Sequence, residues 1–236
     1  MENILISFLS KFTDYPFTVK LEGKEYQIGR GKPEFIVDFK KPISKAALFT
    51  SFKTPDDTLY QAQVNKVDYI LQKLNLKEGL TLLDIGCGWG YLLIEAAKKY
   101  KIKGVGITLS TEQCNEFKKR IEQEKLQDYL RAEIMDYRDL PKSGLAFDRV
   151  VSVGMVEHVG RPNYQLFIDC VDKVLNTGGI FLLHFISALK EHAGDPWIKK
   201  YIFPGGTVPS LREVVASMAE DDFHILYFSV QLCSTL

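Results

Sequence analysis

The sequence predicts an α/β fold, a doubly wound and mostly parallel sheet, with a small α+β accessory domain at the N-terminus. An apolar stretch at residues 81–84 runs into a glycine turn and then a helical pattern, as in the first strand–helix unit of an open sheet. Short apolar runs then alternate with stretches of helical length up to residue 184, which is typical of a parallel sheet. Since residues 1–50 lack this alternation, we expect an accessory domain there and a main domain over residues 51–236.

Residues 1–50 are expected to form a unit of their own. Residues 17–21 and 26–28 alternate between apolar and polar side chains around a turn at residues 22–24, which predicts a hairpin. A further strand is predicted at residues 35–39. A short amphipathic helix is predicted from the helical spacing of Leu5, Phe8, Leu9 and Phe12. The residue types favour a small core over a surface that faces lipid, and both interpretations stay open.

The main domain is expected to begin with a helix. Thr54, Pro55 and the two aspartates after them combine a cap, a proline at the first position and acids in the first turn. The stretch that leads to this helix, residues 40–55, contains prolines, serines and lysines and is the predicted boundary. Helices are then predicted at residues 91–100, 111–124 and 164–174, and strands at residues 104–108, 130–134, 150–153 and 180–184, with Gly178-Gly179 before the last strand.

Composition argues against binding through net charge, against a metal site and against a membrane-spanning segment. The 30 basic and 30 acidic side chains cancel, so no net field draws the protein to nucleic acid or to an anionic membrane. The 4 cysteines form no C-x-x-C pair and the 4 histidines share no spacing, which predicts reduced thiols, a cytoplasmic setting and no metal site. The sequence shows neither a cationic and apolar leader nor an apolar run long enough to span a bilayer.

The turn at residues 86–90 is the most informative motif. Its spacing is G-x-G-x-G with Asp84 ahead of it, whereas dinucleotide folds have G-x-G-x-x-G, so an NAD oxidoreductase is disfavoured. Gly86, Gly88 and Gly90 have no Cβ that would oppose positive φ or keep a ligand from the backbone. The turn resembles the S-adenosylmethionine (SAM) turn of class I methyltransferases. The alternative is a strand–helix turn that is merely tight.

Polar residues follow the next two strands. Thr108, Ser110 and Gln113 come where dinucleotide and many SAM folds place an acid that holds the ribose hydroxyls. The Gln113 amide can donate and accept, and Ser110 could instead cap the following helix. After the third strand, Asp136 lies where SAM folds often have an acid that accepts a hydrogen bond from the adenine amino group, with capping of a turn as the alternative.

Candidate catalytic residues fall at the ends of the last two strands. Asp148 is expected to precede the strand at residues 150–153, and Glu157 and His158 follow that strand. A carboxylate at this edge of a sheet is placed for electrostatic stabilisation or proton handling. Glu157 could instead only hold the turn, and His158 could be packed or capping. His184 closes the last strand, where a histidine is commonly a core residue, but the shared sheet edge favours a function.

Together these motifs resemble those of the cyclopropane-fatty-acyl-phospholipid synthases, over nearly the whole chain and including the small N-terminal domain. The resemblance is carried by residues 83–90, 106–113, 136–139, 151–160 and 195–206. It implies transfer of a methylene group from SAM to the cis double bond of an unsaturated acyl chain in a membrane phospholipid. The residues that it implies for SAM binding are Asp84, Gly86, Cys87, Gly88, Thr108, Ser110, Gln113, Asp136 and Tyr137.

The same resemblance implies further components of the site. The family is thought to hold a bicarbonate ion as the base that removes a proton before the ring closes. Glu157, His184 and the backbone of Ile186 match three of its contacts. A homodimer is also implied, cytoplasmic and peripherally associated with the inner face of the membrane, with N-terminal domains that address the bilayer.

Two departures from the family pattern bear on activity. An aromatic-rich family segment, with a cysteine near the bicarbonate, is absent where residues 47–51 run directly into Phe52. Residues 228–236 also depart before a family tyrosine near the site. The departures fit either a sequence from which residues are missing or a shortened protein, and the intact flanking motifs favour the first. Two alternatives stay open: a SAM methyltransferase that closes no ring, and a SAM- or lipid-binding protein without catalysis.

Overall fold

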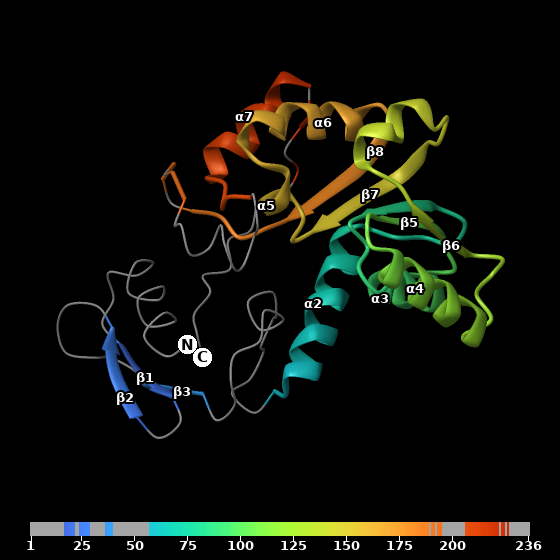
Figure 1. Ribbon diagram of the computed structural model, residues 1–236. Helices are drawn as coiled ribbons and strands as arrows, with labels where there is room; N and C mark the ends of the chain where they lie inside the picture. The colour runs from blue at the N-terminus through green and yellow to red at the C-terminus, as the bar shows by residue number, and fades with distance from the viewer. Residues whose placement is uncertain are drawn as a thin grey trace. The chain divides into compact units, whose positions relative to one another are not determined.

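The computed structural model describes the backbone of residues 17–21, 24–28 and 36–39, and then residues 57–188, 190–191, 193–194, 206–221, 223–224 and 226. The chain divides into two units, residues 1–66 with 228–236 and residues 67–227, and each is described by itself (Figure 1). The predicted N-terminal helix, the predicted boundary at residues 40–55, most of the motif at residues 195–206 and the tail at residues 228–236 lie outside the described residues.

The N-terminal unit contains a sheet of three strands, β1 (Phe17–Leu21), β2 (Lys24–Ile28) and β3 (Ile36–Phe39), in the order β2-β1-β3. Strands β1 and β2 are antiparallel, while β3 runs parallel to β1. The predicted hairpin and third strand are therefore confirmed. Two bounds differ: β2 begins at Lys24, which the prediction placed in the turn, and β3 begins at Ile36, one residue later than predicted.

The second unit is built on a five-stranded parallel sheet in the order β6-β5-β4-β7-β8, which confirms the predicted doubly wound fold. All five strands end at one edge, because their pairing is parallel. From residue 59 the elements are α2 (Leu59–Lys73), β4 (Thr81–Ile85), α3 (Tyr91–Tyr100), β5 (Lys103–Thr108), α4 (Thr111–Gln123), β6 (Leu130–Ile134), η2 (Tyr137–Lys142), β7 (Phe147–Val153), α5 (Val156–Val159), η3 (Arg161–Asn163), α6 (Tyr164–Asp172), β8 (Leu175–His184) and α7 (Leu211–Glu220).

Both faces of this sheet are covered. Side chains alternate along β4, so Leu82 packs into one hydrophobic cluster with α3 and α4, whereas Leu83 and Ile85 pack into a second cluster with α6. Figure 1 shows α3 and α4 on one side of the sheet and α6 and α7 on the other. Burial on both faces explains why the strand sequences are nearly continuously apolar. No helix in the described part of the chain is both long enough and apolar enough to cross a bilayer.

The start of α2 differs from the prediction. The helix begins at Leu59 and is capped by Thr58, whose Oγ1 accepts a hydrogen bond from the Gln61 amide at 3.1 Å. The predicted cap at Thr54 lies outside the described residues. A threonine followed by helix-forming residues is present at both places, and the pattern alone does not choose between them.

Strands β7 and β8 both begin earlier than predicted. Asp148 lies inside β7 and not before it, because its carboxylate accepts from the amide and the hydroxyl of Thr81, both at 2.9 Å, and so joins β7 to β4. Strand β8 begins at Leu175 and passes through the glycine pair as an irregularity in its pairing with β7. Gly178, at φ +76°, supplies the conformation that this irregularity requires.

Candidate active site

The glycine turn after β4 is pinned to the neighbouring strand. The amides of Gly86 and Cys87 both donate to the carbonyl of Ile107 on β5, each at 3.0 Å. The Gly90 amide donates back to the Cys87 carbonyl at 3.0 Å and closes the turn just ahead of α3. The loop is therefore held in place before any ligand binds, as a site for a cofactor requires.

Gly88 and Gly90 of this turn require glycine for different reasons. At Gly90, a Cβ would lie 1.9 Å from the buried ring of Phe117, so this residue lets α4 pack close to the turn. At Gly88, φ is +55° and a Cβ would meet nothing within 4 Å. Open space beside Gly88 lets a ligand reach the backbone. Within this turn, Gly90 is thus a position for packing, whereas Gly88 has open space beside its backbone.

Two residues beside the turn are buried. Asp84 is 3% exposed near the end of β4 and lies opposite Gly106 in the sheet. Burial, and secondarily the charge of Asp84, raise the pKa of the Cys87 thiol. Cys87 is therefore an uncharged thiol that packs against the sheet, and any contribution to cofactor binding would come from its backbone.

The polar residues after β5 hydrogen bond to one another. Thr108 Oγ1 donates to Gln113 Oε1 at 2.9 Å, and the Ser110 amide donates to Thr108 Oγ1 at 3.2 Å. Ser110 Oγ accepts from the Gln113 amide at 3.2 Å, so Ser110 caps α4, as the alternative interpretation predicted. The side chain of Gln113 is consequently held over the end of β5.

Asp136 caps the 3₁₀-helix η2. Its Oδ1 accepts from both the Arg138 amide and Arg138 Nε at 2.9 Å, and the Arg138 guanidinium holds the pKa of this carboxyl below its usual range. The capping interpretation of Asp136 is thus seen in the structure. The ring of Tyr137 packs edge-on against Phe167, with centroids 5.3 Å apart, and belongs to the core beneath this turn.

Glu157 is the buried acid at this edge of the sheet. It lies on α5, the short helix directly after β7, and none of its surface is exposed. Its Oε1 accepts from the Ile186 amide at 2.8 Å, whereas its Oε2 has no hydrogen-bond partner. Burial raises the pKa of Glu157 to about 7, against the lowering effect of the hydrogen bonds from Ile186 and from its own amide.

Other buried polar atoms surround the same short helix. The Thr207 amide donates to the Glu157 carbonyl at 2.9 Å, and a Cβ at Gly206 would lie 2.0 Å from that carbonyl oxygen. Thr207 Oγ1 and the Tyr164 hydroxyl are buried without a hydrogen-bond partner. Burial, followed by the charge of Glu213, raises the pKa of Tyr164 to about 12. Buried polar atoms without partners are expected where a small polar ligand or an ordered water binds.

The two histidines of this region are placed differently. His184 ends β8 opposite Val153, its carbonyl accepts from the Gly154 amide at 2.8 Å, and its side chain is partly buried. His158 is exposed on α5. The structure therefore brings Glu157 and Ile186 into direct contact, puts His184 at the end of the neighbouring strand, and leaves His158 at the surface.

The glycine turn and α5 meet directly. A Cβ at Gly86 would lie 2.9 Å from Cγ of Met155, the residue just before α5. The open backbone at Gly88 and the buried carboxylate of Glu157 therefore belong to two adjoining turns of one sheet edge. In open α/β sheets this edge is where ligands bind.

Comparison with known proteins agrees with this geometry. The family model described as mycolic acid cyclopropane synthetase matches residues 44–232. The chain belongs to this family. It is 46% identical over 162 residues to the cyclopropane-fatty-acyl-phospholipid synthase of Escherichia coli K12, covering 68% of this chain and 41% of that protein. It is 43% identical over 182 residues to a probable fatty acid methyltransferase of Pseudomonas putida, covering 74% of this chain and 46% of that protein.

A solved structure shares the fold. The mycolic acid cyclopropane synthase CmaA1, complexed with SAH and CTAB, superposes with a TM-score of 0.68 at 32% identity, over 75% of this chain and 66% of that one. The chain spans less than half the length of the two curated relatives, 46% and 41% of them. The family assignment of the sequence motifs is therefore confirmed, together with the fold that they predict.

Several residues around Glu157 escaped the sequence analysis. They are Arg161, Tyr164, Thr207 and Glu213. A usable pattern existed only for Glu213, because Ser210-x-x-Glu213 before an apolar pair is a capping box that predicts α7. Nothing local marks Thr207, because it reaches Glu157 only when the chain folds back, and nothing in the pattern of α6 marks the hydroxyl of Tyr164.

Proposed function

We propose that this protein transfers a methylene group from SAM to the cis double bond of an unsaturated acyl chain in a membrane phospholipid and closes a cyclopropane ring. The observation that carries the proposal is the pairing of two features in adjoining turns. One is a turn with open backbone at Gly88, and the other is a fully buried carboxylate, Glu157, with an unpartnered oxygen. The names of the curated relatives support the same chemistry, because they are a cyclopropane-fatty-acyl-phospholipid synthase and a probable fatty acid methyltransferase.

SAM binding is proposed at the carboxyl ends of β4, β5 and β6. The open space beside Gly88 and the fixed amides of the turn fit the approach of a cofactor, and the CmaA1 relative carries SAH, which is SAM after loss of its methyl group. Thr108 and Ser110 support the site mainly by orienting Gln113. The residues proposed to hold SAM, through side chain or backbone, are Asp84, Gly86, Cys87, Gly88, Thr108, Ser110, Gln113, Asp136 and Tyr137.

The chemistry requires an electrophile, a way to stabilise positive charge and a base. SAM supplies a methyl group on a sulfonium, and attack by the alkene leaves positive charge on the acyl chain. Glu157 is placed to stabilise that charge, since a carboxylate in a site that excludes water acts more strongly than one in water. The Oε2 of Glu157 is buried and has no hydrogen-bond partner, so we propose it as the oxygen that interacts with the reacting carbons.

A bicarbonate ion as the base fits the residues present. With a pKa of about 7, Glu157 can carry a proton at neutral pH and donate it in a hydrogen bond to a neighbouring anion. Because the Ile186 amide already donates to Glu157, we expect it to hold the anion through that carboxyl group and not by itself. His184, at the end of the neighbouring strand, is proposed as the further contact.

The substrate lies in a membrane, so the protein must reach a bilayer. We infer a peripheral contact with the inner face of the membrane, because the proposed substrate is a phospholipid. Net charge does not supply the attraction, since acidic and basic residues balance. A homodimer is proposed with it, from the family resemblance alone.

The test uses the purified chain, SAM and vesicles of a cis-monounsaturated phospholipid. Mass spectrometry of the recovered acyl chains should show a gain of one CH₂ in a chain that resists hydrogenation. Vesicles of a saturated phospholipid with the same head group are the matched control and should show no gain. The same gain with a double bond that can still be reduced would replace the proposal by methylation without ring closure. Bound SAM with no gain would replace it by a binding protein.

A further inference from the structure

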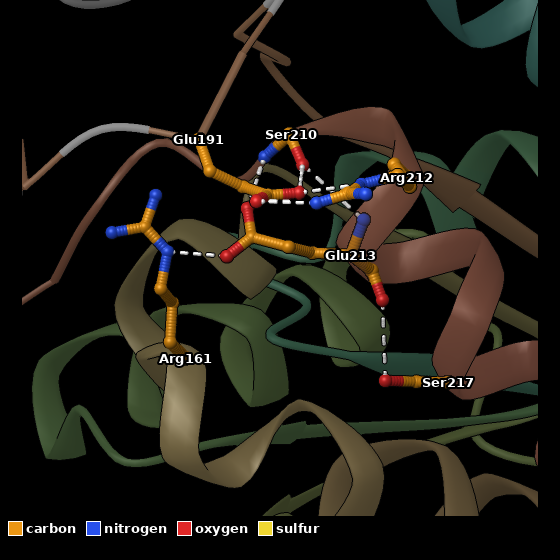
Figure 2. A network of polar contacts seen from close by, with 6 residues as sticks. All are labelled: Arg161, Glu191, Ser210, Arg212, Glu213 and Ser217. Carbon is orange, nitrogen blue, oxygen red and sulfur yellow. Dashed lines mark hydrogen bonds and ion pairs between the residues drawn. The ribbon is translucent and has the colours of Figure 1, made fainter.

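A polar network joins the segment after α5 to the start of α7. Figure 2 shows Arg161 reaching toward Glu213 on α7, and Arg161 Nε donates to Glu213 Oε1. The other oxygen of Glu213 accepts from the Ser210 amide at 2.7 Å, while Ser210 Oγ accepts from the Glu213 amide at 3.2 Å. Glu213 therefore does two things at once, because it completes the capping box of α7 and pairs with Arg161.

The segment that Glu213 caps is the one that supports Glu157. Ser210 ends the stretch in which Gly206 lies against the Glu157 carbonyl and Thr207 donates to it. The same stretch contacts the segment after β8, since the Ala188 amide donates to the Pro209 carbonyl at 2.8 Å.

That second segment also carries the donor to the carboxylate. Ile186 lies two positions before Ala188, and its amide donates to Glu157 Oε1. The contacts thus form a closed ring that runs from Glu157 to Ile186, along the chain to Ala188, across to Pro209, and through Thr207 back to Glu157. The Arg161–Glu213 pair is a further connection beside this ring. Arg161 lies just after α5, and Glu213 lies in the first turn of α7.

We propose that Arg161 and Glu213 are positioning residues that hold the Glu157 carboxylate in the orientation required for methylene transfer, an inference that rests on the proposed function. The pair is partly buried, with side-chain exposures of 29% for Arg161 and 17% for Glu213, so water competes weakly for it. Neither side chain is assigned a contact with the substrate or SAM. Their effect passes through the backbone of Thr207 and Ile186.

A second ion pair in the network provides an internal comparison. Arg212 Nε and Nη2 donate to the two oxygens of Glu191 at 2.8 and 2.6 Å, but Arg212 is 82% exposed. Exposed pairs contribute little and do not fix a neighbouring segment tightly. Arg212→Met is therefore the matched control, since it removes an arginine of the same network that donates to Glu191 and not to Glu157, Ile186 or Thr207.

The test measures amide exchange and kinetics in the same variants. Glu213→Gln keeps an oxygen for the Ser210 amide, so α7 stays capped while the charge opposite Arg161 is lost. In Glu213→Gln and Arg161→Met we expect about tenfold faster hydrogen exchange at the Ile186 and Thr207 amides, with the Gly86 amide unchanged. We also expect kcat to fall about tenfold while KM for SAM changes less than about twofold. Arg161→Lys should restore part of kcat, and Arg212→Met should match the parent protein.

Amide exchange separates this inference from the proposed reaction. If no methylene transfer is found but exchange at Ile186 and Thr207 rises as expected, the proposed function fails and the positional coupling stands. Exchange at these amides in Glu213→Gln that equals the parent protein would overturn the inference, whatever the turnover. Faster exchange at every amide, including Gly86, would also overturn it, because the pair would then support the whole fold.

Discussion

The turns after β4 and β7 adjoin at one edge of the sheet but are held in different ways. The turn after β4 is fixed by glycine conformations, by a hydrogen bond within the turn and by two of its own amides, which donate to the Ile107 carbonyl on the neighbouring strand β5. The turn after β7 depends on distant residues, because Glu157 takes its hydrogen bond from Ile186, 29 positions away, and Arg161 pairs with Glu213, 52 positions away. A tight glycine turn can thus be fixed by residues close to it in sequence and by the adjacent strand, whereas the orientation of a buried acid depends on contacts from distant segments.

The largest expected effect separates the two turns by function. Glu157→Gln should lower turnover by about a thousandfold, because the carboxylate proposed to stabilise the positive charge is lost, while the affinity for SAM stays within about twofold. Steady-state kinetics and SAM titration calorimetry measure the two quantities. Glu122→Gln, on the exposed face of α4, is the control and should alter neither. Equal losses of turnover and SAM affinity would give Glu157 a structural role instead.

The second expected effect is a pH dependence of the free energy of unfolding that arises from the carboxyl group of Glu157. Burial raises the pKa of Glu157 from 4.5 to about 7, so the folded protein binds this proton more tightly than the unfolded chain. The contribution of Glu157 to the free energy of unfolding therefore falls as pH rises through this range. Glutamine stays neutral, so Glu157→Gln should be more stable than the parent above pH 7, by at most about 3 kcal/mol.

Urea unfolding of both proteins at about pH 5 and about pH 8 measures this difference. The variant's advantage should grow between the two pH values, and the exposed Glu122→Gln control should show no such growth. An advantage that is the same at both pH values would mean that the proton on Glu157 is not linked to folding.

The smallest expected difference lies within the glycine turn. Gly90→Ala should cost about 3 kcal/mol of stability, since its methyl group would lie 1.9 Å from the Phe117 ring at a φ of +77°. Gly88→Ala should cost only about 1 kcal/mol, because nothing lies within 4 Å, but it should weaken SAM binding. Urea unfolding and calorimetry distinguish the two. Equal stability losses would contradict the separation of packing from cofactor approach.

Features set by neighbouring residues were predicted well from the sequence. Helix α3 and strand β6 have the predicted bounds, and α4 differs by one residue at its end. Errors arose where a distant partner changes the outcome. Asp148 joins β7 because Thr81 on β4 donates to it, and β8 passes through a glycine pair that the sequence pattern placed before the strand.

Candidate site residues divide in the same way. The sequence predicted Asp84, Gly88 and Glu157 as candidate site residues from their positions at strand ends, and it left open whether Ser110 and Asp136 cap turns. The structure shows that both do. These hydrogen bonds span only two or three residues, yet a capping serine or aspartate has the same sequence pattern as one that faces a ligand, so the pattern could not decide.

By itself, then, the sequence determined the parallel sheet, the glycine turn and the family. Hydrophobic periodicity, glycine spacing and the order of the motifs can all be read from residues that are close together in the chain. Only the tertiary structure decided that Gly90 serves packing while Gly88 faces open space, and that Glu157 is fully buried with one free oxygen. It also decided that Ile186 and Thr207 bond to that acid and that Arg161 pairs with Glu213. Burial and hydrogen bonding here depend on contacts between segments that are distant in sequence. These contacts form only when the chain folds, so no local sequence pattern predicts them.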